Sequence, residues 1–306
     1  MIGIGECIHI ISQDVRNAVE NRDKAFIQDL AKRQVDKGAA YLDLNIGPQK
    51  KAGAEVMPWI VETVQEVTDV PLSLDTTNAV AMEAGLKVCK KKALINSTSA
   101  DPERLKLAMP LAAKYNADII ALTLRATGLP VTADARVEIL MDDLLTAAEE
   151  YGVPQENLFI DPLVLTVNGT QEHAPELPKA ILLIKGMTDP PLKTTCGLSN
   201  ISSGAPAGLR PLLNRVFMVI LLGAGLDSAI MDPLDDKLME TLRIVDKKDD
   251  STPLGKLYSD LYDAHAEGEQ LDTSTIDTSD PEIRDVVKTI DVLQGKTLYA
   301  HGYLGT

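Results

Sequence analysis

The chain has 306 residues, and 45 acidic against 30 basic side chains give it a formal net charge of -15. This charge repels nucleic-acid phosphates and anionic lipid surfaces, so we expect neither nucleic-acid nor membrane partners. No apolar run approaches the roughly 20 residues of a spanning helix, and the N-terminus lacks the basic and apolar regions of a signal peptide, which together predict a cytoplasmic protein.

Short apolar, β-prone runs alternate along the chain with helical patterns. The predicted strands are 2–5, 40–44, 71–74, 93–95, 118–123, 158–160, 194–197 and 229–231. Between them, apolar side chains recur at three- and four-residue spacing, as at Val56, Ile60 and Val64. Asp101 lies at an N-cap position and Gly152 at a helix C-terminus. Eight alternations predict one domain, 1–306, with the fold of a (β/α)8 TIM barrel, and a doubly wound sheet is the alternative.

Polar residues lie at or just past the ends of the predicted strands. They are Glu6, Asp43, Asn45, Asp75, Asn96, Thr123, Asp161, Asn200 and Asp232. In a (β/α)8 barrel these positions converge on one mouth, the face on which active sites lie. One polar strand end is more often a helix cap, but a ring of Asp and Asn suits a ligand rich in N–H donors. A pterin or guanine edge fits that description.

The loop 197–210 joins the seventh predicted strand to a helix. Glycine and alanine let its backbone lie close to a ligand, and Ser199, Asn200 and Arg210 add donors, acceptors and a charge. The alternative is an ordinary surface loop rich in Gly and Ser. Its place at the predicted barrel mouth favours a binding loop.

The segment 246–282 has a different composition, with eleven acidic and three basic residues. Helical spacing over 253–266 predicts one amphipathic helix, and the polar run 271–280 predicts a flexible stretch. We interpret the segment as an acidic insertion before the last barrel helix, predicted at 283–293. It is either a solvated excursion of the surface or a docking element for a partner protein.

Metal-ligand patterns are weak in this sequence. Cys7, Cys89 and Cys196 are far apart and form no Cys-x-x-Cys pair, which argues against a disulfide framework and a zinc site. The four histidines never fall at the i, i+4 spacing that places two ligands on one helix face. We therefore expect no protein-bound metal.

Six motifs in order, each near a predicted strand end, carry a resemblance to a known family. They are Leu-Asp-Leu-Asn-Ile-Gly-Pro (42–48), Leu-Asp-Thr-Thr-Asn (74–78), Ile-Asn-Ser-Thr (95–98), Phe-Ile-Asp-Pro-Leu (159–163), Gly-Leu-Ser-Asn-Ile-Ser (197–202) and Arg-Pro-Leu-Leu-Asn-Arg (210–215). The chain resembles the pterin-binding methyltransferase family, which includes the methyltetrahydrofolate:corrinoid protein methyltransferases of acetogens and the tetrahydrofolate methyltransferases of anaerobic demethylating systems. The folate-binding domain of methionine synthase and dihydropteroate synthase are more distant members.

The resemblance implies a homodimeric (β/α)8 barrel that moves a methyl group between tetrahydrofolate and the cobalt of a corrinoid, such as cobalamin, held by a partner protein. The residues it assigns to the pterin or to the loop over it are Asp43, Asp75, Asn96, Asp161, Gly197, Ser199 and Asn200. It places Asn200 at the ring nitrogen that carries the methyl group, as the catalytic residue. Arg210 would lie near the folate or the incoming corrinoid.

Two other functions use the same pocket. One is a non-catalytic carrier of folate or pterin, which nothing in the sequence excludes. The other is dihydropteroate synthase, whose family has a Lys on the seventh strand and an Arg-x-His signature at the eighth. This chain has Thr-Thr-Cys-Gly (194–197) and Ile-Met-Asp-Pro (230–233) there, so the synthase is disfavoured. His9 departs from the Asn common in the methyltransferases.

Overall fold

The computed structural model describes residues 1–48 and 52–305, and all eight predicted strands form within them. The strands are β1 (Ile2–His9), β2 (Tyr41–Asn45), β3 (Leu72–Asp75), β4 (Leu94–Ser99), β5 (Asp118–Leu122), β6 (Leu158–Asp161), β7 (Lys193–Thr194) and β8 (Ser228–Met231). Neighbouring strands are parallel, in the order β7-β6-β5-β4-β3-β2-β1-β8. This confirms the (β/α)8 barrel.

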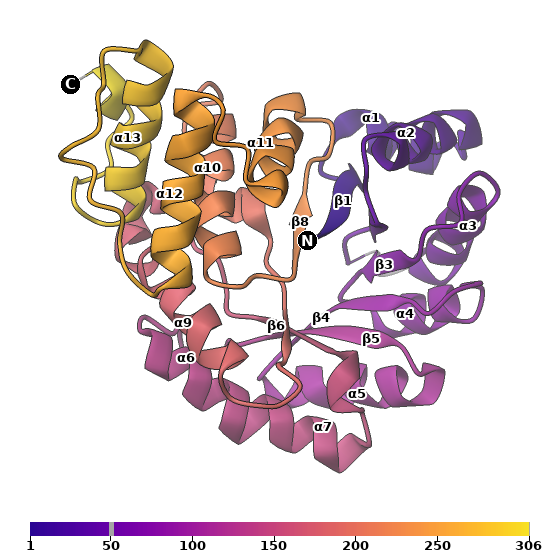
Figure 1. The fold of residues 1–306 in the computed structure, drawn as a ribbon. Helices are drawn as coiled ribbons and strands as arrows, with labels where there is room; N and C mark the ends of the chain where they lie inside the picture. The colour runs from indigo at the N-terminus through magenta and orange to yellow at the C-terminus, as the bar shows by residue number, and fades with distance from the viewer. Residues whose placement is uncertain (49–51, 306) are drawn as a thin grey trace.

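Helices surround the strands (Figure 1). They are α1 (Gln13–Glu20), α2 (Lys24–Asp36), α3 (Gly53–Gln65), α4 (Ala79–Leu86), α5 (Pro102–Tyr115), α6 (Ala133–Ile139), α7 (Thr146–Tyr151), α8 (Val167–Thr170), α9 (Glu176–Lys185), α10 (Arg210–Gly223), α11 (Asp236–Lys247), α12 (Pro253–Ala266) and α13 (Pro281–Leu293). A π-helical segment, η1 (Leu140–Leu145), joins α6 to α7, and short 3-10 turns include η4 (Leu198–Ser202). Within the described residues, none of these helices combines the length and the apolar character that crossing a membrane requires.

The predicted helix signals act as expected. Asp101 accepts a hydrogen bond from the Glu103 N–H at 2.9 Å and so caps α5. Gly152 ends α7 with φ of 70°, a left-handed conformation that glycine adopts without strain. The periodic apolar residues Val56, Ile60 and Val64 of α3 are buried against the sheet. Local sequence therefore sets both the ends and the orientation of these helices.

The barrel interior changes from apolar to polar along the strands. Four side chains, one from β1 and one each from the adjacent strands β4, β5 and β6, form a buried cluster inside the barrel: Ile4, Leu94, Ile120 and Phe159. Since side chains alternate along a strand, the next interior residues on three of these strands are Glu6, Asn96 and Asp161. The upper interior layer is therefore polar on β1, β4 and β6, at the carboxyl ends of these strands, while β5 contributes Leu122.

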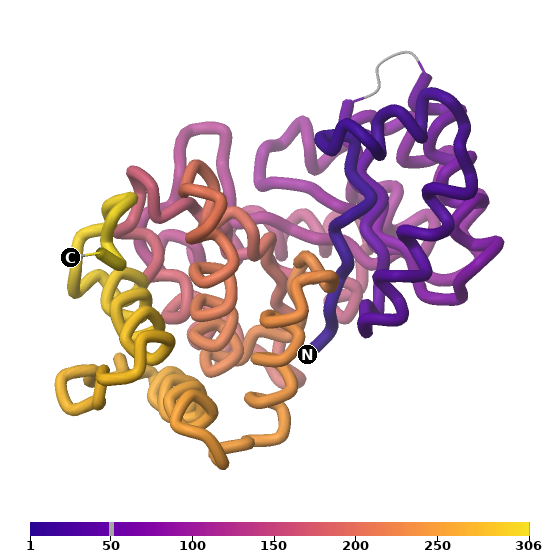
Figure 2. Tube along the Cα trace, turned by 90° about the horizontal axis from the view of Figure 1, so that it is seen from above, coloured from indigo at the N-terminus to yellow at the C-terminus, as the bar shows by residue number. Residues whose placement is uncertain are grey.

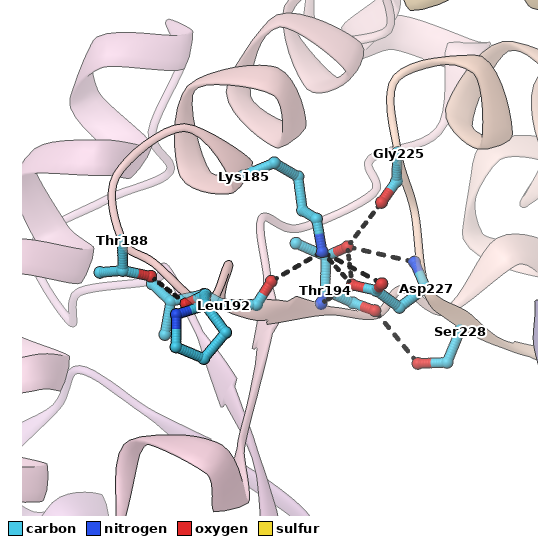
Figure 3. A network of polar contacts seen from close by, with 8 residues as sticks. Lys185, Thr188, Leu192, Thr194, Gly225, Asp227 and Ser228 are labelled. Atoms are coloured by element: carbon cyan, nitrogen blue, oxygen red, sulfur yellow. Dashed lines mark hydrogen bonds and ion pairs between the residues drawn. The ribbon is translucent and has the colours of Figure 1, made fainter.

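The barrel closes between β7 and β8 through few backbone bonds. The ladder here is a single parallel bridge between Gly197 and Ile230. A polar network at the other end of the two strands adds to it (Figure 3). The Asp227 carboxylate accepts hydrogen bonds from Lys185 Nζ at 2.8 Å and from the Thr194 backbone N–H at 2.7 Å. Asp227 therefore joins α9, β7 and β8.

Asp227→Ala is expected to destabilise the protein by about 2 kcal/mol, because it leaves the Lys185 ammonium and the Thr194 N–H without their acceptor. Denaturant unfolding measures the change. Asp236→Ala is the matched control, since it removes an ion pair to Lys37 whose two side chains are 44% and 76% exposed; we expect less than about 0.5 kcal/mol there. An equal loss of unfolding free energy in the two variants would contradict the conclusion that Asp227 stabilises the closure of the barrel between β7 and β8.

The eighth barrel helix is α11, which follows β8 directly. Helices α12 and α13 come after it and pack against α10 on its outer side (Figures 1 and 2). The amphipathic helix predicted over 253–266 is confirmed as α12, and Gly223 lets it pack closely, since a Cβ there would lie 2.4 Å from the Tyr262 carbonyl oxygen. The structure does not confirm 246–282 as an insertion within the eighth unit. The helix predicted at 283–293 forms as α13, but it lies outside the ring because α11 already occupies that position.

Candidate active site

The strand register brings the predicted polar residues together at the mouth. Asn45 pairs with Asp75, and Asp75 pairs with Asn96, across β2, β3 and β4. His9 on β1 lies opposite Asn45. Its ring Nδ1 accepts a hydrogen bond from the Ser12 N–H at 3.3 Å, and burial lowers its pKa. Asn45, Asp75 and Asn96 therefore lie side by side in one row at the mouth.

Asp43 lies one layer deeper, and only 3% of it is exposed. Its Oδ1 accepts hydrogen bonds from Ser73 Oγ at 2.5 Å and from Asn96 Nδ2 at 3.0 Å. Burial raises the pKa of Asp43, and the two hydrogen bonds oppose the rise. The bond from Asn96 fixes that amide with its Oδ1 free to accept from a ligand.

Asp75 accepts a hydrogen bond from Asn45 Nδ2 on the neighbouring strand. Burial raises the pKa of Asp75, the charge of Asp43 raises it further, and the Arg104 guanidinium opposes both. The charge of one carboxylate disfavours ionisation of the other, so this pair favours a state in which one of the two is protonated. Asp43 and Asp75 together can therefore accept a hydrogen bond from an N–H donor of a ligand while one of the two carboxyl groups stays neutral.

Asp161 completes the deep part of the mouth and is 7% exposed. Its Oδ1 accepts from the Leu163 N–H at 2.8 Å. Burial raises the pKa of Asp161 to about 7, although the Leu163 N–H and the Arg136 charge favour the carboxylate. Arg136 is fully buried on α6 and donates from Nε to the Pro162 carbonyl at 2.7 Å, so it also holds the chain that follows β6.

Asp161→Asn is expected to make the protein progressively more stable than wild type as the pH rises from about 4 to 7. Because the pKa rises from 3.8 in the unfolded chain to about 7 in the fold, the folded state binds this proton more tightly. Its contribution to the free energy of unfolding therefore falls across that range, by up to about 4 kcal/mol. Denaturant unfolding at pH 5, 6, 7 and 8 measures the difference, and a constant difference would show that Asp161 stays ionised.

The loop after β7 covers one side of the mouth. Ser199 Oγ donates a hydrogen bond to Glu6 on β1, and burial raises the pKa of Glu6. Asn200 is exposed, and a Cβ at Gly197 would lie 3.0 Å from its Nδ2, so glycine leaves room for that amide. Arg210 is exposed and donates from Nε to Ser202 Oγ at 3.4 Å. The loop is therefore anchored through Ser199, while Asn200 stays accessible.

The structure adds contributors to the site that sequence patterns did not single out. Ser73 holds Asp43, and its signal was available, because it precedes Asp75 by two residues on the same face of β3. Arg104 donates to the Ser97 carbonyl at 2.9 Å beside Asp75, and Arg136 acts beside Asp161. Arg104 and Arg136 lie on helices, where nothing in the sequence pattern indicates that they contact the strand ends. Among residues 1–48 and 52–305, no three His, Cys, Asp or Glu side chains are arranged to hold a metal ion.

The chain is similar to several known proteins. The family model described as pterin binding enzyme matches residues 13–232. The methylcorrinoid:tetrahydrofolate methyltransferase of Eubacterium limosum is 32% identical over 266 residues, which cover 86% of this chain and 96% of that protein. The methionine synthase of Mycobacterium tuberculosis is 33% identical over 229 residues, 72% of this chain but 19% of that longer protein.

Solved structures support the fold. The dihydropteroate synthase of Thermus thermophilus is 19% identical with a TM-score of 0.57, and the match covers 80% of this chain and 92% of that one. The dihydropteroate synthase of Xanthomonas albilineans with 4-aminobenzoic acid is 18% identical with a TM-score of 0.59, covering 80% and 93%. From the family match and the similarity to the E. limosum protein, this chain belongs to the pterin binding enzyme family.

Proposed function

We propose that the protein transfers a methyl group between tetrahydrofolate and the cobalt of a corrinoid carried by a partner protein. The observation that carries this proposal is the set of acids and amides on β2, β3, β4 and β6, of which Asp43 and Asp161 are buried and Asp75 and Asn96 half-buried. It occurs in a chain 32% identical to a methylcorrinoid:tetrahydrofolate methyltransferase along 86% of its length. The residues suit the donor-rich edge of a pterin. Nothing in this assignment requires a metal held by the barrel itself.

The pterin ring would bind to Asp43, Asp75, Asn96 and Asp161. Its amino group and ring N–H groups are donors that a carboxylate accepts in pairs, and its carbonyl oxygen needs a donor. Asp161 Oδ1 is already bonded to Leu163, which leaves Oδ2 for the ligand. The raised pKa values of Asp43 and Asp75 let this cluster carry a proton near neutral pH.

Asn200 would act at the ring nitrogen that gains or loses the methyl group. That nitrogen is a poor leaving group unless it gains a proton or positive charge as the methyl departs. An amide can rotate to accept from the protonated nitrogen or to donate to the neutral one, so it serves both states. Ser199 and Gly197 would hold the loop over the ring, and Arg210 would lie near the folate or the arriving corrinoid.

The corrinoid supplies the cobalt that receives or delivers the methyl group. Because it arrives on another protein, the barrel mouth must admit it, and the exposed Asn200 suits such access. We also propose that the whole chain, 1–306, is one domain, that it works as a homodimer in the cytoplasm, and that neither nucleic acid nor a membrane is a partner.

The alternative functions are weaker. A non-catalytic folate carrier would bind the pterin with the same acids but would have no use for an accessible amide at the reacting nitrogen. Dihydropteroate synthase would need basic groups for a pyrophosphate. Lys193 of β7 donates to the Glu156 carbonyl at 2.7 Å, before the start of β6 and away from the mouth. Thr194 is fully buried and bonded to Asp227, and Asp232 follows β8, so these positions supply no cation at the mouth.

Calorimetric titration with tetrahydrofolate, followed by product analysis, separates the two folate-binding functions from the synthase, and transfer of the methyl group from methylcobalamin to tetrahydrofolate separates the methyltransferase from the carrier. The proposal predicts stoichiometric binding of tetrahydrofolate and no pteroate from a pterin pyrophosphate and 4-aminobenzoate. Absence of tetrahydrofolate binding would contradict the proposal, and formation of pteroate would establish the synthase instead.

A further inference from the structure

One cavity of the molecule lies outside the barrel mouth. It has a volume of about 480 Å³ and lies between α10, α11, α12 and the start of α13. This volume is within the range of small-molecule sites. Its polar lining includes Arg215 and Lys237, and its apolar lining includes Ile244, Leu254 and Ile283. No residue from the strand ends contributes, so it is distinct from the candidate active site.

Arg215 is the unusual group in this cavity. Its side chain is 7% exposed, and within residues 1–48 and 52–305 no hydrogen bond or ion pair reaches its guanidinium. The chain's other deeply buried arginine, Arg136, donates to the carbonyls of Pro162 and Val131 and contacts the His173 ring. None of its nitrogens is among the fully enclosed polar atoms, so the guanidinium of Arg215 opens onto the cavity without a partner among the described residues and is available to a ligand there.

The other polar residues of the cavity do not pair with Arg215. Tyr258 is 1% exposed, and its hydroxyl has no hydrogen-bond partner in the described part of the chain. Lys237 pairs with Glu282 at 3.1 Å. The Asp280 carboxylate accepts from backbone N–H groups at the start of α13, and Asp249 accepts from Ser251. Three of the four acids that line the cavity are therefore committed to other partners, and the fourth, Glu240, is exposed.

We propose that this cavity binds a small organic carboxylate. Its carboxylate group pairs with the Arg215 guanidinium and accepts from the Tyr258 hydroxyl, and its apolar body packs against Ile244, Leu254 and Ile283. A single negative charge fits better than a phosphate dianion, because four acids line the cavity against two cations: Glu240, Asp249, Asp280 and Glu282. The site is independent of the proposed methyl transfer.

Calorimetric titration of the full chain with hexanoate tests the proposal, in the presence of saturating tetrahydrofolate so that the barrel mouth is blocked. Hexanamide is the neutral control ligand, and ionic strength is held constant with chloride. We expect hexanoate to bind with one site per chain and at least about tenfold more tightly than hexanamide, because only the acid carries the charge that Arg215 pairs with.

Arg215→Met should weaken hexanoate binding at least about tenfold, and Tyr258→Phe should weaken it severalfold while preserving the ring that packs there. Arg243→Met removes an exposed arginine of α11 and should leave the affinity unchanged, which controls for net charge. Unchanged binding in Arg215→Met, equal affinity for hexanamide, or no binding to wild type would each overturn the proposal. The last result would mean that water alone solvates Arg215.

Discussion

Replacing Asn200 by alanine is expected to slow methyl transfer by about 10²–10³-fold, while the affinity for tetrahydrofolate falls only severalfold. The amide is exposed at the mouth and is not bonded to Asp43, Asp75 or Asp161, so its loss leaves the acid row intact. Its proposed partner is the ring nitrogen whose charge changes during transfer. Single-turnover rates at saturating folate, with dissociation constants measured in parallel, separate the two effects.

Ser203→Ala is the control for this experiment, because Ser203 is exposed on the same loop and lies outside the proposed site. It should leave both the rate and the affinity near wild type. If Asn200→Ala instead abolished folate binding and left the rate per bound molecule unchanged, Asn200 would be a binding residue and the catalytic assignment would be wrong.

Asp75→Ala is expected to weaken tetrahydrofolate binding by about 5- to 150-fold, which corresponds to about 1–3 kcal/mol. The variant removes an acceptor from the pterin edge and leaves the Asn45 amide without its partner. Calorimetric titration at pH 7 measures the affinity.

Asp134→Ala provides the matched loss of one negative charge, since Asp134 is exposed in the first turn of α6. Its folate titration should match that of wild type. A titration curve for Asp75→Ala that also matched wild type would remove Asp75 from the pterin site, and with it the proposed role of the Asn45, Asp75 and Asn96 row.

Much of the fold was predictable because its signals are local. Each predicted strand formed, although β1 and β4 each extend four residues further and β7 ends three residues earlier than predicted. Asp101 begins α5 and Gly152 ends α7 as expected. The mouth followed from a simple rule, since parallel strands bring their carboxyl ends together. That rule places Asp75 beside Asn96 without knowledge of any long-range contact.

The remaining features depend on tertiary packing. The sequence pattern suggested that the last barrel helix lay at 283–293, yet α11 takes that position because it follows β8 directly. Apolar periodicity shows which face of a helix is buried but not which partner covers it, so the packing of α12 on α10 could not be foreseen. Arg136 and Arg215 are both charged residues on helices, and only the fold distinguishes the saturated one from the unpaired one.

The most direct test of the proposed function is the absorption spectrum of methylcobalamin mixed anaerobically, under reducing conditions, with tetrahydrofolate and this protein, beside the Asn200→Ala variant. The account predicts conversion to cobalt(I) that requires both the protein and tetrahydrofolate, and that is slowed at least about 10²-fold in the variant. Conversion at equal rates with wild type and variant, or none with wild type even when its own corrinoid protein replaces free methylcobalamin, would contradict it.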